Sequence, residues 1–80
     1  MALLAIESGD QDPFYAHTVY AGDEAVGIVT SAAHGHRTGL NIGLAYLRDP
    51  DTARQADEGR GPPLEVRLLN WRYRARILAR

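Results

Sequence analysis

Side chains that could do chemistry gather in one polar stretch, residues 31–39, between two aliphatic segments. The stretch contains Ser31, His34, His36 and Arg37. A serine and a histidine three residues apart could meet across a loop as nucleophile and base. However, no acidic residue is positioned to orient the histidine, and no Gly-x-Ser-x-Gly elbow surrounds the serine. The pattern therefore favours hydroxyl groups that cap a loop over a catalytic pair.

Metal binding is the second chemistry that the histidines suggest. His34 and His36, together with His17, would offer three imidazole ligands to zinc. No carboxylate lies near the pair in the sequence, His17 falls in a different loop, and two histidines are too few for a structural site. We therefore expect no catalytic and no metal-binding residues, and we interpret the stretch as a contact with a neighbouring domain.

A basic segment near the end of the sequence offers a third possibility. Arg72, Arg74 and Arg76 share one face of the expected last strand, with Tyr73 opposite and Trp71 at the preceding turn. A basic strand with aromatic residues could bind single-stranded nucleic acid or an acidic protein. The net charge of -1, the absence of lysine and the inward parity expected for the aromatic residues argue against nucleic acid. We keep a stand-alone binding module as the alternative and favour a solvated or domain-facing strand.

Length and composition limit the chain to one small domain, residues 1–80. The absence of cysteine excludes a disulfide framework, a thiolate metal site and a cysteine nucleophile. No apolar run reaches the roughly 18 residues of a membrane-spanning helix, and the first six residues lack the basic flank of a signal peptide. We expect a soluble, cytoplasmic protein with no membrane partner.

Short strands separated by turns must position these side chains. The expected strands cover residues 3–7, 18–20, 25–31, 40–47, 64–68 and 73–78. Residues 48–63 are polar and rich in Gly and Pro, which predicts a flexible surface loop with at most one helical turn near 52–57. Since closure removes exposed strand edges, the sequence predicts an all-β fold, a small six-stranded β-barrel that is closed or nearly closed.

Details of the strands predict where the sheet bends and which side faces the core. Leu4 and Ile6 are the expected inward pair of the first strand, and alternation in 64–68 points its three aliphatic residues to one side. Gly27 and Gly43 stand inside the two central strands, where glycine weakens pairing unless a bulge or tight bend requires it. We expect these glycines to mark corners of a strongly curved sheet.

The order of these features resembles the C-terminal barrel domain of the glycine-cleavage T-protein (aminomethyltransferase) family, which also ends dimethylglycine and sarcosine dehydrogenases. The residues that carry the resemblance are the opening strand 3–7, Asp12-Pro13, the strand 26–31 that is similar to the family's G-x-V-T-S, the His34-Gly35-His36 run with Gly39, and the strand 42–47 that looks like the family's I-A-L-A-Y-V. It spans essentially the whole chain, and residues 31–39 look closer to the dehydrogenase-type branch. Residues 49–61 exceed the family's usual short turn, and the sequence stops before the Pro-aromatic tail common in the family.

The resemblance implies an accessory role. In that family the tetrahydrofolate site and the catalytic aspartate lie in a preceding, larger domain, so the barrel is not expected to be catalytic on its own. The implied partner is this folate-binding transferase domain, in the same chain or a separate one, which the barrel would help to close. Tetrahydrofolate is implied for the parent enzyme, with FAD in a dehydrogenase-type parent of one-carbon metabolism. The residues that would then contact the folate-binding domain, or line the edge of its folate cleft, are Ser31, His34, His36 and Arg37.

Overall fold

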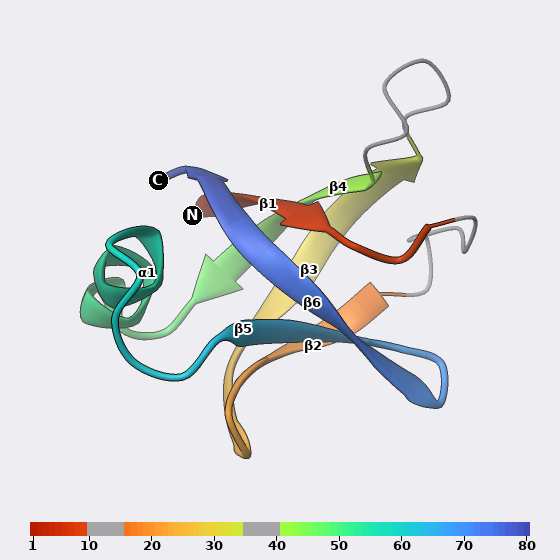
Figure 1. Cartoon of the computed structure of the whole chain (residues 1–80). Coiled ribbons are helices and arrows are strands. Elements are labelled where there is room, and N and C mark those ends of the chain that lie inside the picture. The colour runs from red at the N-terminus through yellow and green to blue at the C-terminus, as the bar shows by residue number, and fades with distance from the viewer. Residues whose placement is uncertain (10–15, 35–40) are drawn as a thin grey trace.

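Six antiparallel strands close into a barrel in this computed structural model, which describes residues 1–9, 16–34 and 41–80 (Figure 1). The strands are β1 (Ala2–Ile6), β2 (Ala16–Ala21), β3 (Glu24–His34), β4 (Asn41–Leu47), β5 (Leu64–Leu68) and β6 (Trp71–Ala79), with helix α1 (Pro50–Asp57) between β4 and β5. Around the barrel the order is β1-β4-β3-β2-β5-β6, and β6 returns to pair with β1. The expected all-β barrel is confirmed.

The core consists of small and medium aliphatic side chains that alternate along the strands. Leu4 and Ile6 are buried as expected, and so are all three aliphatic residues of β5. The remaining members of the core cluster are Ala2 of β1 and, from the other strands, Val19, Val26, Ala45 and Ala75. Each fully buried aliphatic side chain contributes about 1.5–3 kcal/mol of transfer free energy, so this interior is the main source of stability in so short a chain.

Strand β3 is longer than the sequence predicts and includes part of the polar stretch. It continues to His34 because β4 pairs with it along this whole segment, with Ser31 opposite Leu44 and His34 opposite Asn41. The ladder hydrogen bonds stabilise an extended backbone in residues whose own strand preference is weak. The expectation that residues 32–34 belong to a loop is therefore wrong.

The two glycines of the central strands differ in what they allow. A Cβ on Gly27 would clash with the carbonyl oxygen of Tyr46 and lie 2.7 Å from Leu47 Cδ2, so glycine here permits close approach of β3 and β4. The β2–β3 register also shifts beside it, as expected of a corner. Gly43 pairs regularly, and the irregularity of the β3–β4 ladder falls at Thr30 instead.

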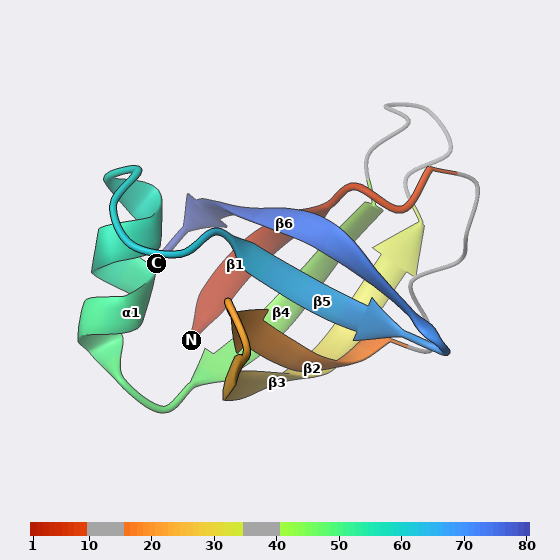
Figure 2. The same cartoon turned by 60° about the horizontal axis from the view of Figure 1, so that its bottom comes forward.

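Helix α1 covers one end of the barrel and is longer than the single turn that the sequence predicts (Figure 2). Asp49 caps its start by accepting a hydrogen bond of 2.9 Å from the backbone N–H of Asp51, and Pro50 occupies the first turn. Ala53 is buried and Ala56 packs against the core, so one small-residue face is covered. Cap, proline and packing together extend the helix. The flexibility of residues 48–63 stays a prediction, and no helix in the described part of the chain is long and apolar enough to cross a membrane.

Candidate functional site

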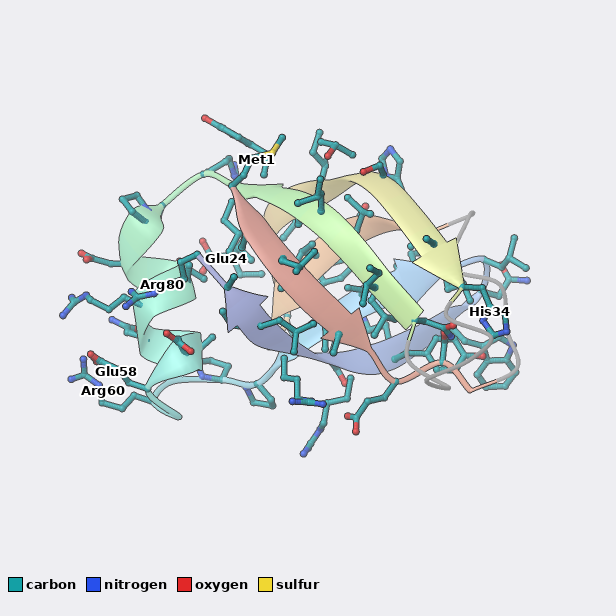
Figure 3. All side chains as sticks on the ribbon, turned by 90° about the horizontal axis from the view of Figure 1, so that it is seen from above. Met1, Glu24, His34, Glu58, Arg60 and Arg80 are labelled. Carbon is teal, nitrogen blue, oxygen red and sulfur yellow. The ribbon has the colours of Figure 1, made fainter. Side chains whose placement is uncertain are left out.

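A buried polar network ties three chain segments together at the barrel end opposite α1. The amide nitrogen of Asn41, a residue only 1% exposed, donates to Ser8 Oγ at 2.6 Å and to the carbonyl oxygen of Gly9 at 3.0 Å. The amide oxygen of Asn41 is hydrogen-bonded to Nδ1 of His34. Because the amide oxygen can only accept, Nδ1 of His34 carries the proton. Asn41, the first residue of β4, thus links residues 8 and 9, which follow β1, to His34 at the end of β3, labelled in Figure 3.

The two predicted site residues that the structure describes, Ser31 and His34, are not brought together by the fold. Ser31 is exposed and stands opposite Leu44, whereas His34 stands opposite the buried Asn41. Their positions along β3 have opposite parity, so the two side chains leave opposite faces of the sheet. A nucleophile and base pair between Ser31 and His34 is therefore not formed. His36 and Arg37 lie outside the described residues, and their predicted role in docking stays a prediction.

The third histidine lies on β2, away from the network. His17 is exposed, and its Nδ1 lies 3.0 Å from Thr18 Oγ1. Within residues 1–9, 16–34 and 41–80, no group of three or more histidine and acidic side chains is arranged to hold a metal ion.

Arg72 of the basic strand is engaged within the fold. Its guanidinium lies 3.8 Å from the centre of the Tyr20 ring, and Nη1 donates to the carbonyl oxygen of Gly22 at 3.0 Å and to Glu65 Oε1 at 3.4 Å. These contacts hold the β2–β3 turn against β6. A planar guanidinium stacked on an aromatic ring and bonded to a turn carbonyl is a structural clamp more than a ligand contact.

The aromatic residues of β6 behave differently from each other. Tyr73 is half-buried and packs against the core, as its inward parity predicts. Trp71 also has inward parity, because it pairs with the buried Leu68, but its side chain is 70% exposed. It is the first residue of β6, at the β5–β6 turn, which projects from the barrel (Figure 1). There the inward side of the strand lies beyond the core cluster.

The structure has an exposed apolar surface on β1, β4 and β3 that the sequence patterns above did not predict. Its residues, which we call the apolar sheet face, are Leu3, Ile28, Ile42, Leu44 and Tyr46. Register places Ile28 opposite Tyr46 and Leu3 opposite Leu44, and the exposed fractions of Ile28, Leu44 and Tyr46 are 47%, 41% and 53%. Figure 3 views the barrel from the side of these strands.

The alternation of 42–47 carried the signal that would have revealed this face. The large residues Ile42, Leu44 and Tyr46 alternate with Gly43 and Ala45, both of which are buried. In a narrow barrel the small residues fit the crowded interior, and the large residues must then point outward.

Comparison with known families gives a match over the full length. A family model described as glycine cleavage T-protein C-terminal barrel domain matches residues 1–80. No curated protein matches the chain. The matched region contains the whole barrel, α1, the Asn41 network and the apolar sheet face.

Proposed function

Because the chain belongs to the glycine cleavage T-protein C-terminal barrel family, we propose that it is the accessory barrel of a tetrahydrofolate-dependent enzyme. The parent is an aminomethyltransferase or a demethylase of the dimethylglycine or sarcosine dehydrogenase type, in one-carbon metabolism. In this proposal the barrel packs on the folate-binding domain, in the same chain or a separate one, and helps to close it. The observation that carries the proposal is the family match across residues 1–80.

The barrel's surface supports an accessory role rather than folate binding by this domain alone. Small-molecule sites usually bury most of the ligand in an enclosed cleft. The depressions along the described residues, about 310 to 430 Å³ each, are open to solvent. This openness supports the part of the proposal that assigns tetrahydrofolate and FAD to the larger domain.

The alternative function, a nucleic-acid or acidic-protein module built on Arg72, Arg74 and Arg76, has less support. Arg72 is committed to Tyr20 and the β2–β3 turn. Arg74 and Arg76 are exposed, and no ion pair of either residue occurs among the residues that the structure describes. A titration with a single-stranded oligonucleotide at two salt concentrations separates the two functions, because phosphate contacts weaken steeply as salt rises.

Reconstitution tests the proposed function directly. The chain is co-expressed with the aminomethyltransferase domain of a glycine cleavage T-protein that lacks its own barrel, and folate-dependent transfer of the one-carbon unit is measured. We expect the two proteins to co-purify and the barrel to lower the KM for tetrahydrofolate, since closing a cleft orders the site around its ligand. The control is the transferase domain expressed alone. Failure of the chain to bind the domain, or unchanged kinetics in the presence of bound barrel, would contradict the proposal.

A further inference from the structure

The barrel has two outer surfaces of opposite character. The outward side chains of β5 and of residues 72–76 of β6 are charged: Glu65, Arg67, Arg72, Arg74 and Arg76. The outward side chains of β1, β4 and the first half of β3 form the apolar sheet face. A solvated side of an antiparallel sheet normally carries polar residues, as β5 and residues 72–76 of β6 do. The contrast within one small molecule indicates that the apolar sheet face is covered by something.

The apolar sheet face is continuous across three strands. One shallow depression lies between Leu3, Ile42 and Leu44, and another is lined by Ile28 and Tyr46. Both have predominantly apolar walls. Large aliphatic and aromatic groups that are half exposed at the centre of a surface are the residues that dominate binding energy when a partner desolvates them.

Two cations border this surface among the described residues: Arg76, which pairs with Ala5, the neighbour of Ile42, and Arg48. Arg48 follows β4 and lines the same depression as Ile28 and Tyr46. Its guanidinium donates to the carbonyl oxygen of Ala25, and no carboxylate lies within ion-pair distance of it in the described part of the chain. An arginine that is anchored by one donor and has other donors left suits a carboxylate on a partner.

A second copy of this chain complements the surface poorly. A two-fold axis brings the same surface to itself. With the axis across the strands, Arg48 would lie against the end that carries Ala33 and Ile42, where neither residue is acidic. With the axis along the strands, the two Arg48 side chains would come to the same end and repel, although Glu24 and Asp49, which line a depression beside Arg48, would come to that end as well.

We propose that the apolar sheet face is the surface through which the barrel packs on the aminomethyltransferase domain, with a carboxylate of that domain opposite Arg48. The inference rests on the proposed function and deepens it, because it moves the principal contact from the stretch 31–39 to β1, β4 and β3. The partner surface is apolar, with an acidic residue at its edge.

Two sets of variants test the surface in the co-expression experiment described above, with affinity measured by calorimetry. Leu44→Ser with Tyr46→Ser removes its centre, and Arg48→Glu reverses the bordering charge. The matched control, Arg67→Ser with Arg74→Ser, changes two exposed residues of the charged surface that do not pair with β1. We expect each test variant to bind about tenfold more weakly or worse, and the control to bind within about twofold of the wild type.

Circular dichroism and urea unfolding establish whether each variant is folded. If the double serine variant does not fold, Arg48→Glu still tests the surface by itself. Wild-type binding that survives in the folded test variants would overturn this inference and leave the proposed function standing. A wild-type chain that does not bind the domain at all overturns both. Sedimentation that shows a wild-type dimer abolished by Leu44→Ser with Tyr46→Ser would assign the surface to self-association and also overturn the inference.

Discussion

Replacing Asn41 by alanine should destabilise the barrel far more than an average substitution. The change removes two donated hydrogen bonds, of 2.6 and 3.0 Å, and the acceptor for His34 Nδ1, at a residue that is 1% exposed. The Ser8 hydroxyl is also buried, and a buried polar group left without its partner costs about 1–3 kcal/mol. Allowing for partial relaxation, we expect Asn41→Ala to lower the free energy of unfolding by about 2–4 kcal/mol.

That loss is large for this chain. Native domains are stable by about 0.05–0.15 kcal/mol per residue, which for a chain of 80 residues is about 4–12 kcal/mol. Equilibrium urea unfolding followed by far-ultraviolet circular dichroism measures the change directly. Trp71 is a poor reporter, because it is 70% exposed in the folded state. A markedly lower midpoint with an unchanged slope is the expected result.

The chain supplies its own matched control. Asn70, the other asparagine, lies exposed in the turn between β5 and β6, so Asn70→Ala should change stability by no more than about 0.5 kcal/mol. Asn41→Asp adds a second check, because a carboxylate still accepts from His34 but cannot donate to Ser8 or Gly9, and it should also destabilise. A loss below about 0.5 kcal/mol for Asn41→Ala, or equal losses at the two asparagines, would refute the account of this network.

Two further changes probe the β3–β4 contact and the arginine clamp. Gly27→Ala should lower the free energy of unfolding in urea by about 2 kcal/mol or more, because the new Cβ would meet backbone atoms that cannot move away. Gly43→Ala should cost less, because the nearest atom, at 3.1 Å, is the end of an aliphatic side chain. Equal losses for the two variants would argue against the clash at Gly27. Arg72→Ala should cost about 1 kcal/mol through the lost stacking on Tyr20. Arg76→Ala serves as its control, and a loss as large there would show that the clamp contributes nothing specific.

The pattern of aliphatic residues and turns was sufficient to predict the barrel. Alternation in 64–68 predicts which side of β5 is buried, and the Gly22-Asp23 turn joins β2 to β3 with Gly22 at a positive φ of 64°. These features are local, since a strand of alternating residues buries one face whatever its neighbour is. The resemblance to the family was equally a property of the sequence, and the match over residues 1–80 confirms it.

Local sequence patterns do not encode the structure formed where distant segments meet. The end of β3 forms because β4 pairs with it. Helix α1 is longer than expected because Ala53 and Ala56 pack against one end of the barrel. Neither effect is visible from the propensities of the residues involved. The bond between His34 and Asn41 was missed for the same reason, because the β3–β4 register places the two residues side by side. The role of His34 as a contact for another domain stays a prediction.

By itself, then, the sequence determined the fold class and the family, because burial of alternating aliphatic residues is encoded residue by residue along each strand. The tertiary structure alone decided which polar groups satisfy one another and which apolar residues stay outside. Those outcomes depend on strand register and barrel closure, which put Ser8 beside Asn41 and Ile28 beside Tyr46. A one-residue change of register would exchange the two faces of a strand, so the surfaces of this protein are properties of the closed barrel.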